Sequence, residues 1–315
     1  MGENKMDLAA DKAVEAILRD ELTRENRAAA AVVPVLHHLL SSDAHALVSD
    51  AILARVRGMV MDCAGQLLAA MAGQDPVARA GPVADPAAFD TLVNLLLEDA
   101  ALLGFCHALA NEGLLADRLQ QRHAIDPVLS PLLQELIASD NAAVAGLAMS
   151  ALAAQSRFIQ SQRRMELPLG ELPAEFFHAV IARAGRLAGS DMAQAGLVRL
   201  QQAYDEGVSR IGLLGRLVAA MRKGVVVALA LDHAGLALFA SALAAQTRIE
   251  REAAVLACHE GQGIRLAVAL HSAGVGLPAI ERQLLLTEPV TRLPRALGTL
   301  SVEQASALLQ AGRAL

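Results

Sequence analysis

Two stretches of the sequence decide the fold, GVVVALALDHAGLALFA over Gly224–Ala240 and GIRLAVALHSAGVGLPA over Gly263–Ala279. They align without gaps thirty-nine residues apart. Helical repeat arrays have periods of about 34–47 residues, so the pair predicts a repeat of helical hairpins. The aligned identities include Gly224/Gly263, Ala228/Ala267, Ala230/Ala269, Leu231/Leu270, Ala234/Ala273, Gly235/Gly274 and Leu238/Leu277.

Each unit is expected to contain a capped helix, a turn near Gly224 or Gly263, a second helix and an Ala-Gly stop. The glycine of that stop supplies the left-handed residue that often follows a helix. We expect units near residues 209–235 and 247–274, and a weaker terminal unit near 291–312. Because one hairpin cannot bury its apolar stripe alone, the units should stack. The predicted architecture is a HEAT-like α-solenoid of stacked helical hairpins.

The rest of the chain also predicts helix. Ala, Leu, Arg and Glu dominate, and apolar residues recur at spacings of three and four, which is the helical period. Side chains that accept hydrogen bonds from the first turn of a helix mark helix starts. The expected starts are Asp85-Pro86, Asp126-Pro127, Thr247-x-x-Glu250 and Ser301-x-x-Gln304. The fold class is therefore all-α.

A linker is expected over residues 73–86, where three prolines and two glycines occur in fourteen residues and prevent a continuous helix. It separates an N-terminal helical bundle, residues 1–72, from a helical-repeat domain, residues 87–315. The N-terminal segment should hold three helices, near Asp7–Arg19, Arg24–Leu40 and Asp43–Ala72. A second break, Glu166–Pro173, carries leucines that can pack, so we interpret it as a loop within one body.

Several helix starts share a small turn, a proline and an apolar helix: Ile125-Asp-Pro127, Leu172-Pro173 and Leu277-Pro278. A later segment, Ile249–Gly274, has the pattern I-x-x-x-A-x-x-L…G…LA-x-AL-x-x-AG. In these features the chain resembles the bacterial domain of unknown function 2336, over roughly Arg122–Gly276. The resemblance implies helical repeats and an interaction role, and it brings no catalytic residues. The N-terminal third departs from the pattern.

Composition excludes several partners. The net charge is −6, the pI is about 5.9, and the aromatic residues are one Tyr and six Phe, so neither a phosphate backbone nor unstacked bases would be bound well. The first 22 residues alternate charged with apolar residues, which is unlike a secretory signal. The best membrane candidate, Val225–Leu243, carries Asp232 and His233 at its centre, where charge is costly. We expect a cytoplasmic protein with no membrane span.

The residues that could support chemistry are few. Cys63, Cys106 and Cys258 have no metal-binding spacing, and we expect three buried thiols. His37 and His38, with Asp43 and His45, could hold a metal, but neighbouring helical residues point about 100° apart, so solvation at a helix end fits better. Cys258-His259-Glu260 resembles a nucleophile beside a base, although catalytic partners usually come from separate segments. The expectation is no enzyme, no metal and no cofactor.

One set of charged residues is a candidate interaction site. Arg210, Arg248 and Arg292 recur at the start of the expected units and could form a ridge that grips acidic partners. Alternatively, they are solvated residues of the first helical turn. The sequence predicts a non-enzymatic helical-repeat protein acting as an interaction or regulatory scaffold, with homodimerisation. A sensor that binds an apolar small molecule between helices is the alternative, and a hydrolase using His and Asp is a third hypothesis.

Overall fold

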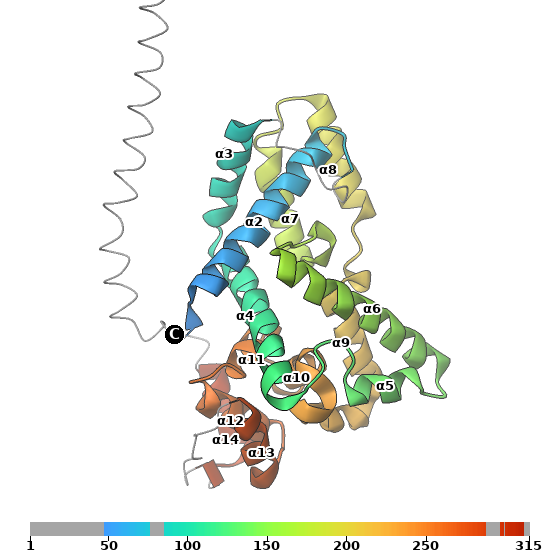
Figure 1. The fold of residues 1–315 in the computed structure, drawn as a ribbon, viewed down its shortest axis with the longest axis vertical. Helices are drawn as coiled ribbons and strands as arrows, with labels where there is room; N and C mark the ends of the chain where they lie inside the picture. The colour runs from blue at the N-terminus through green and yellow to red at the C-terminus, as the bar shows by residue number, and fades with distance from the viewer. Residues whose placement is uncertain (1–46, 76–84, 288–296, 299, 312–315) are drawn as a thin grey trace, which may run out of the picture. The chain divides into compact units, whose positions relative to one another are not determined.

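The computed structural model in Figure 1 describes residues 47–75, 85–287, 297–298 and 300–311. Its contacts divide the chain into two compact units, Met1–Ser49 and Asp50–Leu315. The fold described below is that of the second unit. The helices expected at Asp7–Arg19 and Arg24–Leu40 lie outside the described residues.

The described part of this unit is all helical, which confirms the predicted class. It contains thirteen α-helices, three 3-10 helices and no strand. The α-helices are α2 (Asp50–Met71), α3 (Pro86–Leu97), α4 (Ala100–His123), α5 (Pro131–Ile137), α6 (Ala142–Arg164), α7 (Ala174–Gly185), α8 (Asp191–Ala203), α9 (Arg210–Met221), α10 (Leu231–Thr247), α11 (Arg251–Ala257), α12 (Gly263–Ser272), α13 (Leu277–Thr287) and α14 (Val302–Ala311). The 3-10 helices are η2 (Leu169–Glu171), η3 (Glu206–Val208) and η4 (Arg222–Leu229).

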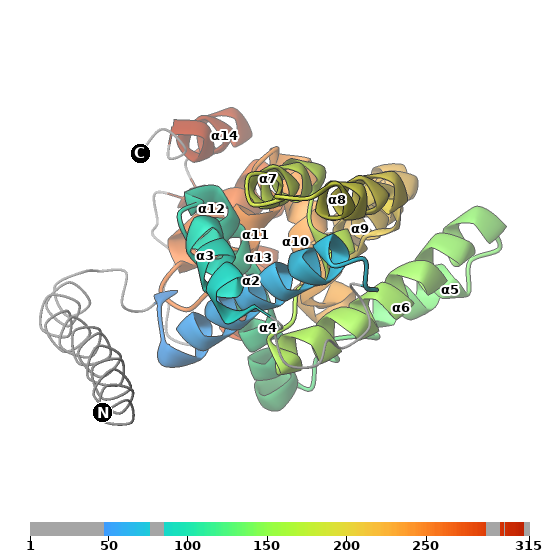
Figure 2. The same cartoon turned by 90° about the horizontal axis from the view of Figure 1, so that it is seen from above.

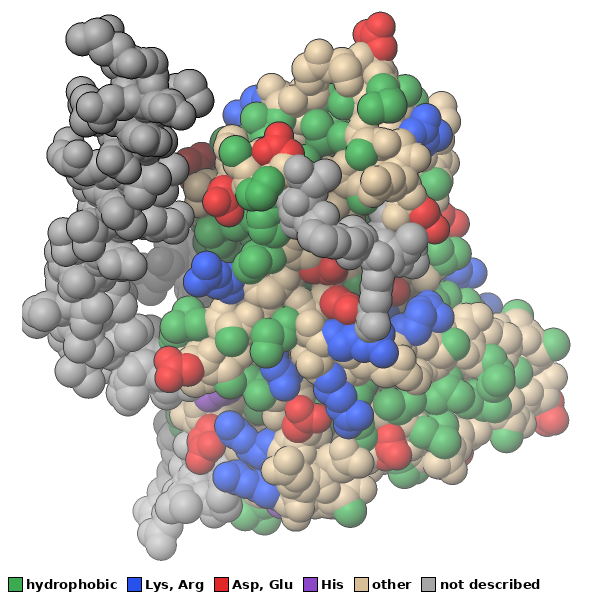
Figure 3. Space-filling view, turned by 45° about the horizontal axis from the view of Figure 1, so that its top comes forward, with side chains coloured by type: hydrophobic (Ala, Val, Ile, Leu, Met, Phe, Trp, Pro, Cys, Tyr) green, Lys and Arg blue, Asp and Glu red, His purple; other side chains and the backbone are tan. Residues whose placement is uncertain are grey.

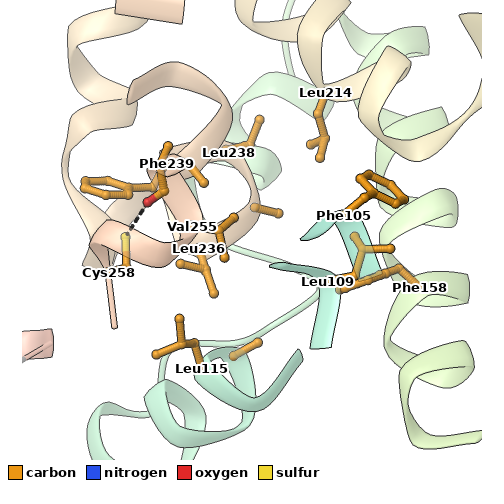
Figure 4. Close-up of a cluster of buried hydrophobic side chains, with 14 of the residues drawn as sticks. Phe105, Leu109, Leu115, Phe158, Leu214, Leu236, Leu238, Phe239, Val255 and Cys258 are labelled. Atoms are coloured by element: carbon orange, nitrogen blue, oxygen red, sulfur yellow. Dashed lines mark hydrogen bonds between the residues drawn. The ribbon is translucent and has the colours of Figure 1, made fainter. Parts of the chain in front are cut away.

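Helix α4 lies at the centre of the unit. It packs against α2, α3, α6, α10, α11 and α13, and Figure 4 shows its side chains meeting those of α6, α9, α10 and α11. Burial of this apolar surface is the main stabilising contribution to the fold. The core residues shown there include Phe105, Leu109, Leu115, Phe158, Leu214, Leu236, Leu238, Phe239 and Val255.

The segment expected as a linker, residues 73–86, does not separate the two compact units. Helix α2, which precedes it, packs against α3, α4, α7 and α8, so both sides of the segment belong to one compact unit. At Gly196 of α8, an added Cβ would collide with the carbonyl oxygen of Ala70 at the end of α2. This close approach explains why α2 does not separate from the rest: the proline-rich segment joins two helices of one core.

The two repeat copies share a glycine of positive φ but differ in structure. The φ angles of Gly235 and Gly274 are 68° and 79°; Gly274 follows the end of α12, as predicted for an Ala-Gly stop, whereas Gly235 lies at a kink inside α10. However, the first copy contains α9, the 3-10 helix η4 and a long α10 bent at Gly235, whereas the second contains the short α11 and α12. The break at Gly235 also divides the stretch Val225–Leu243. In the third unit, α14 packs against α12.

Two of the four predicted helix starts are confirmed. Asp85 accepts from the Ala88 N–H before Pro86, and Ser301 and Gln304 exchange hydrogen bonds in a capping box.

The other two predicted starts are wrong. Asp126 accepts from Val128 and Leu129 in a turn, and α5 begins later, after the N-cap Ser130. Thr247 is the last residue of α10, and its hydroxyl donates to the Leu243 carbonyl. In both places a local hydrogen bond satisfies the side chain without starting a helix.

Candidate functional site

Of the three arginines of the predicted ridge, Arg210 does not lie on the surface. Arg210 is 2% exposed and lies at the first position of α9, in the core. Arg248 is exposed, but it ends α10 with φ 59° instead of starting a helix. Arg292 lies outside the described residues. The sequence therefore identified Arg210 as notable but assigned it the wrong environment.

Arg210 belongs to a buried ion cluster with Glu112 of α4 and Arg251 of α11, which we call the Glu112 triad. Arg210 donates to Glu112 through Nη1–Oε1 at 2.7 Å and Nη2–Oε2 at 2.9 Å. Arg251 donates to the same carboxylate through Nη1–Oε2 at 2.8 Å and Nη2–Oε1 at 2.7 Å. Two forked guanidiniums thus saturate one carboxylate, the strongest hydrogen-bonding geometry available to it.

Further contacts hold the triad in place. Gln155 Oε1 accepts from Arg210 Nη1 at 3.2 Å, and Ser241 Oγ accepts from Arg251 Nε at 3.0 Å. The Arg210 guanidinium also lies 3.7 Å from the ring centroid of Phe158, a cation–π contact. The triad therefore links α4, α6, α9, α10 and α11 in the middle of the core.

The side chains of the Glu112 triad determine one another's protonation states because they lie so close together. Burial alone would raise the pKa of Glu112, but the charges of Arg210 and Arg251 and their hydrogen bonds outweigh it and hold that pKa well below its usual range. Burial lowers the pKa of Arg210, and Glu112 opposes that effect. Arginine stays protonated in proteins, so the cluster carries two positive charges and one negative charge.

A pocket of about 360 Å³ adjoins the triad. Its walls come from α4, α6, the start of α9 and the loop that follows α6, and Arg210 forms part of its lining. The loop, predicted as a break within one body, is held by α2. Leu167 N–H donates to Asp62 at 2.8 Å, and Leu169 N–H donates to Gln66 at 2.9 Å. Hydrogen bonds donated by the loop to side chains of α2 therefore fix one wall of the pocket.

The second candidate surface is the arm formed by α5 and α6, which projects from the rest of the unit in Figure 2. Residues 142–156 of α6 include no charged residue, yet only 33% of the most apolar 18-residue window of this helix is buried. Hydrophobic side chains gather over this arm in Figure 3. An open groove of about 580 Å³ lies along it, walled by α6 and the segment containing Val128 and Leu129.

By length and composition, α6 could also cross a membrane, and the bent pair α3–α4 meets the same criterion when taken as one span. One or two such helices are weak evidence, because core helices of soluble proteins pass the same test.

The thiols are buried, as predicted. Cys63, Cys106 and Cys258 are free and inaccessible, and burial raises the pKa of Cys106 and of Cys258 to about 12. Cys258 Sγ donates to the Ala254 carbonyl, while His259 Nδ1 lies 2.7 Å from the Glu260 carbonyl oxygen. The Cys258-His259-Glu260 sequence therefore forms no nucleophile–base pair.

Metal ligands do not gather in the part of the chain that the structure describes: no group of three or more His, Cys, Asp or Glu side chains there could hold an ion. His37, His38, Asp43 and His45 lie outside it.

The sequence analysis missed Glu112, although a signal was present. Phe105, Leu109, Glu112, Ala116 and Leu119 follow one another at spacings of four and three along α4, and all five are buried. A glutamate at a core position of an apolar stripe predicts a buried ionic partner, since an unpaired buried charge is very costly. Arg251 shows the same signal, because it precedes the buried residues Ala254, Val255 and Cys258 at helical spacing.

The fold and these sites define an all-helical protein with a buried ion cluster, a pocket beside it and an exposed apolar arm. Neither a family model, nor a curated protein, nor a solved structure matches the chain.

Proposed function

We propose that the chain is a non-enzymatic helical-repeat protein that acts through protein–protein interaction, and that its primary partner is a second copy of itself. The observation that carries this proposal is an exposed stripe on α6 with heptad spacing. The α6 stripe consists of Ala142, Gly146, Met149, Ala153, Ser156, Gln160 and Arg163. All are exposed except Ser156, which is half-buried. Heptad spacing is typical of a helix that pairs with another helix.

The α6 stripe is complementary to itself. In an antiparallel pair with its two-fold axis near Ala153, Met149 of one copy faces Ser156 of the other, and Gly146 faces Gln160. Each large residue thus faces a smaller one. This is the isologous geometry of two-fold dimers, in which one patch meets the same patch of its partner. The small residues allow the two helices to approach closely.

Charge at the ends of the helix supports the antiparallel orientation. Asp140 precedes Asn141, the N-cap of α6, and Arg163 lies in the last turn of the helix. Antiparallel pairing brings Arg163 of each copy close to Asp140 of the other, and a parallel pair would place like charges together. Complementary charges of this kind mainly fix orientation and register. The half-buried Val128 and Leu129 provide an apolar wall beside the incoming helix.

Sedimentation equilibrium of three full-length proteins tests the proposal. We expect the wild-type chain to be a dimer at micromolar concentration. Ala153→Glu places two carboxylates next to each other at the two-fold axis, and such like-charge pairs cost several kcal/mol, so the dimer should be at least about 100-fold weaker. Ala203→Glu, at an exposed position of α8, is the matched control and should dimerise like the wild type.

A wild-type chain that is monomeric at these concentrations would contradict the proposal. So would an Ala153→Glu variant that dimerises as strongly as the control, because the interface would then lie elsewhere.

We also propose that the chain is a HEAT-like repeat protein that resembles the domain of unknown function 2336. The positive φ of Gly235 and Gly274, at equivalent positions of the two copies, supports this proposal. A cytoplasmic location is part of the proposal, and it is supported by three free thiols in the described structure, which are typical of reducing compartments. The second candidate function, binding of a small molecule between helices, is favoured by the pocket beside the Glu112 triad.

A further inference from the structure

The pocket beside the Glu112 triad has the size and lining of a ligand site. Its volume of about 360 Å³ lies within the 300–1,000 Å³ range of small-molecule pockets. Leu109, Phe158, Leu167, Pro168 and Ile211 supply apolar walls. Leu109, Phe158 and Leu167 are otherwise buried in the core. An apolar molecule that entered the pocket would therefore contact the hydrophobic core directly.

The loop wall of the pocket is held in place by α2. The loop that walls it is held by four interactions with α2: two N–H groups donate to Asp62 and Gln66, and the Leu167 carbonyl accepts from Gln66 and Cys63. At Gly58 of α2, an added Cβ would lie 2.5 Å from the Cβ of Met165, so the loop approaches this helix closely. A preformed site loses little conformational entropy when it binds a ligand.

The charged residues of the pocket favour an anion. Three arginines and two glutamates line it, which are Arg157, Arg164, Arg210, Glu166 and Glu171. The two arginines at the mouth are 60% and 54% exposed, and their ion pairs are long: Arg157–Glu171 is 4.0 Å and Arg164–Glu166 is 3.9 Å. Ion pairs this long and exposed contribute little, so both guanidiniums can turn toward a carboxylate at the mouth.

We propose that this pocket binds an amphipathic monoanion, a single-chain carboxylate with its apolar chain against Leu109, Phe158 and Ile211 and its head group at Arg157 and Arg164. The net positive charge of the Glu112 triad, which adjoins the pocket through Arg210, disfavours a cationic head group. Of the pocket residues on α6, Phe158, Ser161 and Gln162 point away from the α6 stripe, whereas Gln160 belongs to it and Arg157 and Arg164 lie beside it. Because residues of a single chain line the pocket, ligand binding is tested separately from dimerisation.

Calorimetric titration of the full chain with three ten-carbon probes tests the ligand class. Decanoate, decanol and decyltrimethylammonium have equal chains and differ in head-group charge. Below its critical micelle concentration, decanoate should bind at one site per chain, and at least about 10-fold more tightly than decyltrimethylammonium. Equal affinity for the three probes, or the absence of decanoate binding, would overturn the proposal.

Two sets of variants locate the binding. Ser161→Phe places a ring in the pocket and should abolish decanoate binding. Ser150→Phe is the same substitution at an exposed position of the same helix, outside the pocket lining, and it should leave binding unchanged.

The double variant Arg157→Gln, Arg164→Gln changes only exposed side chains. It should remove the preference for decanoate over decanol while circular dichroism remains that of the wild type. Decanoate binding that persists unchanged in Ser161→Phe, or a preference that persists in the double variant, contradicts the assignment.

Discussion

At the scale of single residues, the Glu112 carboxylate is a buried charge that depends on its hydrogen-bond partners. It is 1% exposed and serves two guanidiniums at once. Breaking such a buried pair by removing one partner is far more destabilising than losing a surface ion pair, because the remaining charges stay buried.

Glu112→Gln should therefore destabilise the protein by about 3–5 kcal/mol. Two buried arginines would face a neutral amide, and each would retain its desolvation cost. Urea unfolding followed by circular dichroism measures the effect. Glu281→Gln, the same change at an exposed position of α13, should cost well under 1 kcal/mol. Equal midpoints for the two variants would show that the triad is not a stabilising element.

The same carboxylate predicts a pH dependence. Since the pKa of Glu112 is far lower in the folded chain than its ordinary value of 4.5, its contribution is fully present above that value and is lost as the pH falls below it. The difference in unfolding free energy between wild type and Glu112→Gln should be constant from about pH 8 to pH 5 and then shrink toward pH 3. A difference that grows on acidification would contradict the assigned charge state.

At the scale of elements, helix periodicity and caps were predictable because they depend on neighbours in the sequence. Asp85 and the Ser301–Gln304 pair follow local rules. The error at Arg210 arose because burial depends on what packs against a helix start, and here Glu112 lies 98 residues away. The pocket was beyond prediction for the same reason: its walls come from segments far apart in the sequence.

The loop over residues 166–171 provides a prediction at this scale. Gln66 accepts from the Leu169 N–H and donates to the Leu167 carbonyl. Gln66→Leu therefore leaves the Leu169 N–H unpaired, which costs about 1–3 kcal/mol when such a group is desolvated, and leaves the Leu167 carbonyl with the weaker Cys63 thiol as donor. Hydrogen exchange of residues 166–171 should accelerate while that of α10 stays slow. Gln202→Leu, at an exposed position of α8, is the control. Unchanged exchange in the loop would refute its anchoring by α2.

At the scale of the whole molecule, the position of α2 decides where the chain can be shortened. Met59, Val60 and Leu67 of this helix are at most 1% exposed, and α2 contacts four other helices. A chain shortened to Asp50–Leu315 should unfold cooperatively. A chain that starts at Gly73, the boundary suggested by the proline-rich segment, should lose its cooperative transition, because removal of α2 exposes the core. Thermal unfolding of both distinguishes the two boundaries.

The central claim is that two copies pair through the α6 stripe with Ala153 near the two-fold axis. Disulfide formation in Ala153→Cys measures this most directly, because the three native thiols are buried and a disulfide requires Cα atoms within about 7 Å. Under mild oxidation, Ala153→Cys should become a covalent dimer and Ala203→Cys should remain monomeric on a non-reducing gel. If Ala153→Cys cross-links no faster than Ala203→Cys, the proposed pairing is wrong.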